Sequence, residues 1–390
     1  MRIVSVVGAR PNFMKVAPLC WALRRWPGFE HLLVHTGQHY DQQMSRRFFH
    51  DLDLPVPDIN LEVGSGSHAW QTAEVMRRLE PVLLDKVPDV LIVVGDVNST
   101  LAAALTAAKL HIPIAHVEAG LRSFDREMPE EINRQLTDVL SHFLFVTEGS
   151  GVRNLRREGA DPSRVFLVGN VMIDCLLHYR RVTARSAIRQ ALGLQTSEGA
   201  SRPFALLTLH RPSNVDSMDT LGGILRAIQE VAAKMPVLFP VHPRTRSRIE
   251  ALGYAHDCAG GAGTQGMRLL EPLGYLDFLS LMEDAKIVLT DSGGVQEETT
   301  ALGVPCLTLR ENTERPATVE EGTNQIVGTD PDRIVRAAMA VMRSETRSSR
   351  CPPLWDGHAA ERIIKILAAH LGVPAAEPEL AMSPEAGQRV

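Results

Sequence analysis

Carboxylates, hydroxyls and glycines gather in one short segment, Thr290–Glu298, with the sequence TDSGGVQEE. The segment follows an apolar strand-like run, Lys286–Leu289, and opens a helical pattern. A strand that enters a helix through Ser-Gly-Gly leaves backbone N–H groups uncovered at the positive end of the helix dipole, where anions bind. Glu298, one turn further on, suits the hydroxyls of a ribose. The segment therefore predicts a site for a nucleoside diphosphate.

Charged residues also follow strand-like runs in the first part of the chain. Arg10 and Lys15 follow the first run, where they either clamp an anion or are ordinary surface cations. Asp96 follows the run Val90–Val94, and Glu118 directly follows the next run. Asp96 also fits a helix N-cap. Two carboxylates at neighbouring strand ends would share one crevice, where like charges raise one pKa toward neutrality and favour acid–base chemistry.

Glu131 and Arg134 lie in a helical pattern that opens at Pro129. The apolar stripe of this pattern consists of Ile132, Leu136, Val139, Leu140 and Phe143. Glu131 and Arg134, three residues apart, lie off the stripe and near each other. Acids in a first turn also simply favour the helix dipole. The crowding of charged groups in this segment favours a functional site.

Histidines in the sequence have different interpretations. His210 follows the strand-like run Phe204–Thr208, which favours a phosphate contact or proton transfer over a purely structural role. His35, His39 and Asp41 do not predict a metal site, because no third ligand with metal spacing follows. The first strand is not followed by Gly-x-Gly-x-x-Gly, so the sequence does not predict a bound NAD. We expect neither a metal nor another cofactor.

Strand-like runs and helical patterns alternate along the chain in two series. The first series comprises Ile3–Val7, Leu32–His35, Val90–Val94, Ile114–Val117, Phe143–Val146 and Val165–Val168, and the second comprises Phe204–Thr208, Val237–Pro240, Met267–Leu269, Ile287–Leu289 and Cys306–Leu309. This alternation predicts an α/β fold with two Rossmann-like, doubly wound parallel-sheet domains that face a central cleft.

The expected organisation has five parts. Residues 1–170 form the N-terminal domain, 171–200 the linker helices, and 201–355 the C-terminal, nucleotide-binding domain. Residues 356–371 form a helix that packs back on the N-terminal domain. Residues 372–390, rich in Pro, Ala and Glu, form a disordered tail.

Composition excludes several classes of function. The 390 residues are 44% hydrophobic and 22% charged, as expected of a globular protein, and the net charge is −5. Without a basic surplus, neither nucleic acid nor a membrane surface is an expected partner. The five cysteines are widely spaced and form no CxxC pair. No apolar run reaches membrane-spanning length, so we expect a cytoplasmic protein.

Taken together, these motifs make the chain similar to the non-hydrolysing UDP-N-acetylglucosamine 2-epimerases. The resemblance covers about residues 1–370 and rests on GARPNFMK, HTGQHYD, GDVNST, HVEAGLRS, PEEINRQLTD, TLHRPSNVD, PVHPRT, LTDSGGVQEE and LRENTERP. It implies two Rossmann-like domains around a nucleotide-sugar cleft, an arrangement also found in the GT-B glycosyltransferases. It also implies a homodimer.

The resemblance implies a role for each matching residue. The candidate acid–base groups are Asp96, Glu118 and Glu131, and His210 contacts the diphosphate and helps it depart. The residues implied in substrate binding are Arg10, Lys15, Arg134, Phe278, Ser292, Gly293, Gly294, Glu298 and Arg315. Among these, Phe278 packs on the uracil, Glu298 holds the ribose, and Ser292, Gly293 and Gly294 bind phosphate.

The implied reaction interconverts UDP-N-acetylglucosamine and UDP-N-acetylmannosamine by anti elimination of UDP to a glycal and re-addition. The C2 proton of a 2-acetamido sugar is not acidic until departure of UDP develops positive charge at C1. Relatives with this pattern also act on 2,3-diacetamido uronic acids, so the sugar is open. Alternatives are a hydrolysing epimerase that releases free N-acetylmannosamine, a retaining glycosyltransferase, and a non-catalytic nucleotide-sugar sensor.

Overall fold

The structure is a computed structural model that describes residues 1–37, 56–183, 186–194, 202–254, 266–344 and 350–374, with only the backbone of Arg10 and Arg244. His39, Asp41 and all but three residues of the expected tail lie outside these ranges. No group of three or more His, Cys, Asp or Glu side chains arranged to hold a metal ion occurs within them. In the same ranges, no helix is long and apolar enough to cross a bilayer.

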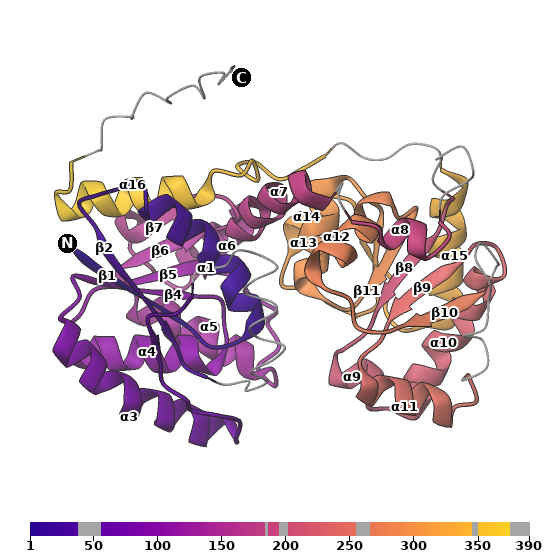
Figure 1. Cartoon of the computed structure of the whole chain (residues 1–390), viewed down its shortest axis with the longest axis horizontal. Helices are drawn as coiled ribbons and strands as arrows, with labels where there is room; N and C mark the ends of the chain where they lie inside the picture. Colours follow the sequence, from indigo (N-terminus) through magenta and orange to yellow (C-terminus); the bar gives the residue numbers. More distant parts are fainter. Residues whose placement is uncertain (38–55, 184–185, 195–201, 255–265, 345–349, 375–390) are drawn as a thin grey trace, which may run out of the picture.

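The N-terminal sheet has seven parallel strands in the order β3-β2-β1-β4-β5-β6-β7. Its strands are β1 (Arg2–Val7), β2 (Glu30–His35), β3 (Ile59–Asn60), β4 (Val90–Val94), β5 (Ile114–Ala119), β6 (Phe143–Val146) and β7 (Val165–Leu167). Its helices are α1 (Arg10–Leu23), α3 (His68–Lys86), α4 (Asn98–Lys109), α5 (Pro129–Leu140) and α6 (Gly149–Arg157), with a 3-10 turn, η1 (Pro162–Arg164). Figure 1 shows α1 on one face of this sheet and α3 and α4 on the other.

The C-terminal sheet has six parallel strands in the order β10-β9-β8-β11-β12-β13. Its strands are β8 (Ala205–Thr208), β9 (Val237–Pro240), β10 (Met267–Leu270), β11 (Ile287–Thr290), β12 (Cys306–Thr308) and β13 (Asn324–Ile326). The helices around it are α9 (Pro212–Val215), α10 (Met218–Ala232), α11 (Pro243–Ala251), α12 (Tyr275–Asp284), α13 (Gly293–Leu302), α14 (Pro316–Glu320) and α15 (Pro331–Arg343).

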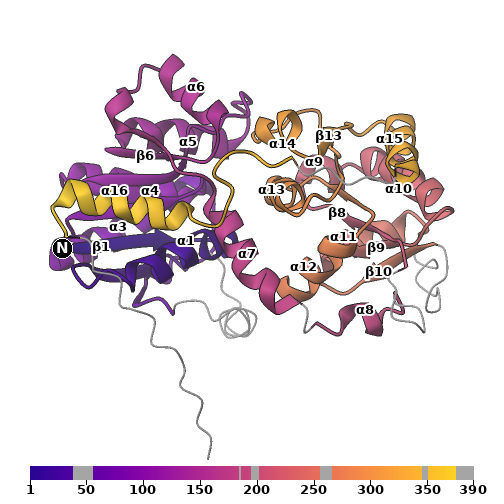
Figure 2. The same ribbon diagram turned by 90° about the horizontal axis from the view of Figure 1, so that it is seen from above.

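Helix α7 (Val171–Thr183) joins the two halves, and α8 (Ile188–Ala191) follows it. The chain later returns to the first half as α16 (Ala359–Leu371), which packs against α1 and α7 and lies on the same face of the sheet as α1 (Figures 1 and 2). Asp174 in α7 caps α16 by accepting hydrogen bonds from the backbone N–H groups of Ala359 at 3.1 Å and Ala360 at 2.7 Å.

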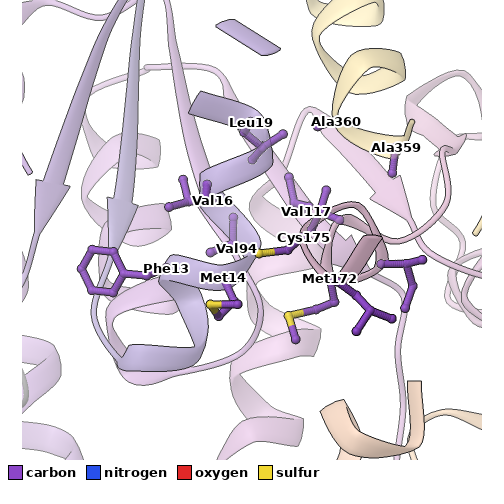
Figure 3. Packing of buried hydrophobic residues seen from close by; sticks show 14 of the residues in the cluster. Phe13, Met14, Val16, Leu19, Val94, Val117, Met172, Cys175, Ala359 and Ala360 are labelled. Atoms are coloured by element: carbon purple, nitrogen blue, oxygen red, sulfur yellow. The ribbon is translucent and has the colours of Figure 1, made fainter. Parts of the chain in front are cut away.

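One hydrophobic core runs through this junction. Figure 3 shows Met14 of α1 and Cys175 of α7 near Val94 of β4 and Val117 of β5, two central strands. The same cluster continues into α12 and α13 of the second half. Since apolar burial of about 25 cal/mol per Å² dominates folding, this shared core favours a fixed placement of the two halves.

The predicted fold class is confirmed, because both sheets are parallel and helices cover them. The domain boundaries stay predictions. Strands β3 and β13 were not predicted. The helix predicted for residues 356–371 begins only at Ala359. The apolar stripe predicted for α5 wrongly included Phe143. Helix α5 ends at Leu140, and Phe143 belongs to β6.

Candidate active site between the two sheets

A cavity of about 640 Å³ lies between the two halves at the carboxyl ends of their strands. Its lining consists of Pro11, Met14, Lys15, Asp96, Val97, Met128, Glu130, Arg134, Met172, His210, Arg211, Pro212, Leu273, Tyr275, Phe278, Ser292, Gly293, Gly294, Val295, Glu297, Glu298, Glu314 and Arg315. The edge where parallel strands end is where open α/β sheets bind ligands. The cavity is large enough for a molecule of the size of a sugar nucleotide.

The N-terminus of α13 forms one wall of the cavity. Ser292 is its N-cap residue and offers no side-chain hydrogen bond to the helix. The free hydroxyl and the first N–H groups of the helix can therefore hold an anion. A Cβ atom on Gly293 would lie 2.6 Å from Oε1 of the buried Glu314. A side chain at this position would therefore force the carboxylate of Glu314 to shift.

Two aromatic residues and Glu298 form the adjoining wall. The hydroxyl of Tyr275 donates a hydrogen bond of 2.8 Å to Oε1 of Glu298. Burial raises the pKa of Glu298 to about 7. Phe278 also lines this part of the cavity. A carboxyl group beside aromatic rings matches what a ribose and its base require, namely a hydrogen-bond acceptor and a flat apolar surface.

His210 projects from the loop after β8, and its side chain is 59% exposed. Its Nδ1 lies 2.8 Å from Oδ1 of Asp291, which is fully buried. Asp291 also accepts hydrogen bonds from the backbone N–H groups of His210 and Arg211 and from the side chain of Asn214. Asp291 therefore fixes the orientation of the imidazole and leaves its other nitrogen free to face a ligand.

Glu118, the residue before the last of β5, has a strained backbone conformation with φ of 75°, at the point where the pairing with β6 shifts by one residue. Its Oε2 pairs with Lys15, and its Oε1 accepts a 3.0 Å hydrogen bond from Nη2 of Arg315. Burial alone would raise the pKa of Glu118, but Lys15 and Arg315 outweigh burial and hold it below its ordinary value. Strain of this kind clusters at functional sites.

Asp96, Arg134 and Glu131 form a chain of ion pairs. Nη1 of Arg134 lies 3.0 Å from Oδ2 of Asp96, and Nη2 lies 3.0 Å from Oε2 of Glu131. Glu131 is fully buried and also accepts hydrogen bonds from the backbone and hydroxyl of Ser123, both of 2.8 Å. Although burial would raise the pKa of Glu131, Ser123 and Arg134 lower it. Asp96 keeps 26% of its side chain exposed and faces the cavity.

His116 ties together the strand ends that carry these acids. Its Nε2 lies 2.8 Å from the carbonyl oxygen of Gly95, and its Nδ1 lies 2.6 Å from Oδ1 of Asp138. The other oxygen of Asp138 accepts hydrogen bonds from the backbone of Gly120 and from Arg122. Gly95 precedes Asp96 and Gly120 closely follows Glu118, so one buried network positions both carboxylates.

The cavity brings together most of the residues singled out in the sequence. Its lining includes Lys15, Asp96, Arg134, His210, Phe278, Ser292, Gly293, Gly294, Glu298 and Arg315. Glu118 and Glu131 lie behind the lining, one against Arg315 and Lys15 and the other against Arg134. The side chain of Arg10 lies outside the described part of the chain. The roles assigned to these residues stay predictions.

Sequence reasoning missed four groups that the structure adds to the site. They are Tyr275, Asp291, Glu297 and Glu314. Asp291 and Glu297 lie inside the TDSGGVQEE motif, but the motif does not tell which of its acids faces the ligand. Tyr275 lies three residues before Phe278, and no pattern in the sequence indicates its hydrogen bond to Glu298. Glu314 follows β12 and gave no signal beyond its charge.

The family model and the similar proteins of known name agree on one family. A family model described as UDP-N-acetylglucosamine 2-epimerase matches residues 21–368. The UDP-N-acetylglucosamine 2-epimerase of Methanocaldococcus jannaschii is 41% identical over 369 residues, which are 94% of this chain and 99% of that protein. The UDP-2,3-diacetamido-2,3-dideoxy-D-glucuronate 2-epimerase of Pseudomonas aeruginosa is 40% identical over 372 residues, with 94% and 99% covered.

A solved structure extends the likeness to three dimensions. The crystal structure of the M. jannaschii UDP-GlcNAc 2-epimerase in complex with UDP-GlcNAc and UDP has a TM-score of 0.83 and 40% sequence identity, and it covers 95% of this chain and 100% of that one. The likeness therefore spans both sheets. The chain belongs to the UDP-N-acetylglucosamine 2-epimerase family.

Proposed function

We propose that the protein interconverts UDP-N-acetylglucosamine and UDP-N-acetylmannosamine, or the C2 epimers of a closely related UDP-2-acetamido sugar. The observation that carries this proposal is the pairing of an anion-binding helix N-terminus with opposing carboxylates. Gly293 and Gly294 on α13 line the same cavity as Asp96, behind which lies Glu118. A pyrophosphate held on one side brings the sugar against acids on the other side.

The binding of UDP follows from the C-terminal wall. The N–H groups at the start of α13 and the hydroxyl of Ser292 bind the diphosphate, with His210 on its opposite side. Glu298 accepts hydrogen bonds from the ribose hydroxyls, and Phe278 packs on the uracil ring. Positive charge from the N-terminal half comes from Lys15 and Arg134. Arg10, which belongs to the motif GARPNFMK, adds a third cation.

The chemistry uses departure of UDP to make C2 acidic. The C1–O bond breaks, its electron pair leaves with the diphosphate, and cations in the cavity stabilise that charge. A carboxylate removes the C2 proton, and the C2–H electron pair forms the C1=C2 bond of a 2-acetamidoglucal. Addition reverses these steps, with the new proton delivered to the opposite face of C2 and a diphosphate oxygen re-forming the bond to C1.

The candidate acid–base groups are in different surroundings. Asp96 borders the cavity, and Glu118 is held as a carboxylate by Lys15 and Arg315. These surroundings support a direct role for both in proton transfer. Glu131 accepts hydrogen bonds from several donors and pairs with Arg134, which supports a role in aiming Arg134 at Asp96 or the diphosphate. All three remain candidates for acid–base work.

The test is ¹H and ³¹P NMR of UDP-N-acetylglucosamine and of the 2,3-diacetamido uronic acid analogue, each incubated with purified protein. We expect a second set of anomeric signals from one of them, with no added metal, NAD or acceptor. Release of free N-acetylmannosamine and UDP would identify a hydrolysing epimerase. Turnover only with an acceptor would identify a transferase, and binding without turnover would identify a sensor.

The protein forms a homodimer through α3 and α5. The apolar stripe of α5 points outward: Ile132, Leu136 and Val139 are 43%, 46% and 74% exposed, while its polar face is buried against the site. A groove of about 380 Å³ beside it is lined by α3 residues and by Ile132. Contiguous apolar surface of this kind marks an interface. A second copy of the chain is the proposed partner. The apolar stripe lies on α5, the helix whose buried face carries Glu131 and Arg134, so a dimer would support the helix that positions these residues.

Light scattering tests the dimer at micromolar concentration. We expect a dimer for the unaltered protein and a monomer for Leu136→Asp. Met218→Asp, which alters a similarly exposed apolar residue on α10, serves as the matched control and leaves the dimer intact. A monomeric unaltered protein contradicts the proposal.

We propose that the protein acts in the cytoplasm. The cysteines support this placement, because Cys20, Cys175, Cys306 and Cys351, which the structure describes, are all free thiols. Cell fractionation with an antibody against the protein tests the location. A predominantly membrane or extracellular signal contradicts it.

A further inference from the structure

Three consecutive carbonyl groups at the end of β4 are each held by a side chain from another element. The donors are Asn12 of α1 to Val94 at 3.1 Å, His116 of β5 to Gly95 at 2.8 Å and Asn133 of α5 to Asp96 at 2.9 Å. Because the chain leaves the sheet here, its carbonyl groups need donors from elsewhere. The turn that carries Asp96 is therefore fixed by side chains of the neighbouring elements.

Asn133 holds the peptide group of Asp96 itself. It is buried, and its Nδ2 lies near two oxygens, the carbonyl of Asp96 at 2.9 Å and Oδ1 of Asn98 at 3.4 Å. A carbonyl oxygen only accepts hydrogen bonds, so the NH₂ end of the amide must face it. An oxygen in place of that nitrogen would be repelled. The position therefore requires a hydrogen-bond donor.

The next residue of α5 contacts the other end of Asp96. Nη1 of Arg134 lies 3.0 Å from Oδ2 of the Asp96 carboxylate. Two consecutive residues of one helix thus contact Asp96 at its main chain and at its side chain. This double contact requires the polar face of α5 to turn inward, which leaves Ile132 and Leu136 outside.

Asp96 has no capping role in the helix that follows it. The N-cap of α4 is Val97, which offers no side-chain hydrogen bond, so the interpretation of Asp96 as a helix N-cap is wrong. The carboxylate of Asp96 is left to face the cavity. Its direction depends on the contacts that α5 makes.

We propose that Asn133 is a positioning residue of the epimerisation, which acts by fixing the peptide group of Asp96. This inference rests on the proposed function, with Asp96 as an acid–base group. Asn133 lies outside the lining of the cavity, beside the groove between α3 and α5, so it acts through Asp96 and not on the sugar nucleotide. Without its hydrogen bond the peptide group can rotate and carry the carboxylate away from C2. A displacement of about 1 Å can cost ~10²-fold in rate.

The experiment is a double-variant cycle on kcat for epimer formation. Asn133→Asp keeps the shape of the side chain but replaces the donor with an oxygen. We expect kcat to fall by about 10- to 100-fold. KM and the dissociation constant for UDP should change by less than about twofold, because the lost interaction serves the chemical step. In an Asp96→Asn background the same substitution should cause no further loss, since the group through which it acts is already absent.

Three outcomes overturn the proposal. They are a normal kcat for Asn133→Asp, a loss that appears mainly in KM or in UDP binding, and losses that multiply in the double variant. A merely structural role would give multiplied losses. Asn133→Ala removes the donor without adding a charge, and it carries the same test if Asn133→Asp does not fold.

Gln71→Glu on α3 is the matched control for charge. Gln71 accepts a 2.9 Å hydrogen bond from Asn98, one residue further from Asp96, and glutamate can accept the same bond. This variant should keep the kcat of the unaltered protein. A loss as large as that of Asn133→Asp would mean a general effect of negative charge and would contradict the inference. If the unaltered protein forms no epimer at all, the proposed function fails instead, and this difference keeps the two failures apart.

Discussion

Arg315 of the C-terminal half donates a hydrogen bond of 3.0 Å to Glu118 of the N-terminal half, across 197 residues of sequence. The same guanidinium lies 2.8 Å from Glu297. Arg315 is therefore the cation that joins Glu118 of the N-terminal half to α13 of the C-terminal half. Its charge stabilises whichever of the two acids is ionised, and its position fixes one half of the site against the other.

Replacement of Arg315 should damage both stability and activity. Arg315→Met leaves Glu118 and Glu297 buried beside a neutral side chain, which typically costs about 3–5 kcal/mol when one partner of a buried ion pair is removed. We expect a large decrease in the free energy of urea unfolding and loss of epimer formation. Arg333→Met is the control, because Arg333 is exposed and pairs with the exposed Glu311 at 3.8 Å. Equal stability of the two variants would contradict this account.

Neutral substitutes at Asp96 and Glu118 should abolish most turnover. We expect Asp96→Asn and Glu118→Gln each to lower kcat by at least ~10²-fold, because a group that transfers a proton cannot be replaced by an amide. The measurement is the steady-state rate of epimer formation from the UDP-sugar that NMR identifies as the substrate. Glu80→Gln on the exposed side of α3 should have no effect. Near-normal kcat for either cavity variant removes that residue from the mechanism.

Gly169 should be intolerant of any side chain. It follows β7 with φ of 89°, and a Cβ atom there would lie 2.0 Å from the carbonyl oxygen of Leu354, in the segment that leads to α16. We expect Gly169→Ala to lower the unfolding free energy by at least ~3 kcal/mol. Gly159 has a similar φ of 79° but open space around its Cβ position. Gly159→Ala should therefore lose only about 1–2 kcal/mol of backbone strain.

Glu298 should give stability a measurable pH dependence. Its folded-state pKa of about 7 lies above the ordinary value near 4.5, so the folded chain binds the proton more tightly than the unfolded chain. Stability from this group is complete below pH ~4 and is lost as pH rises through 7. Relative to the unaltered protein, Glu298→Gln should gain up to about 3 kcal/mol of stability between pH 4 and pH 8. Parallel curves of unfolding free energy against pH would contradict the shifted pKa.

The sequence predicts the strands that are buried on both faces. Val90–Val94 is an unbroken apolar run, as expected of a central parallel strand, and its bounds agree with β4. Strand β3 has two residues and β13 contains Asn324 and Gln325, so neither has an apolar run to detect. Their place at the sheet edges depends on neighbouring strands that a local pattern does not contain.

The helical period of α5 shows its two faces but not which one turns inward. Val139 is 74% exposed, whereas Glu131 and Arg134 are buried. The rule that the apolar face of a helix turns inward fails here, because the polar face of α5 lies against the site and its apolar residues Ile132, Leu136 and Val139 are exposed. The same limit applies to Glu297 and Glu298, which are adjacent acids in one motif. Only the packing of Arg315 and Tyr275 around them separates their roles.

Solvent isotope incorporation at C2 tests the central claim most directly. The protein is incubated with its UDP-sugar in heavy water, and the epimeric product is isolated early, before the reaction reverses. Elimination followed by re-addition predicts a product that carries deuterium at C2, since the returning proton comes from a group in exchange with solvent. A product that forms in heavy water with its C2 hydrogen retained would contradict the account.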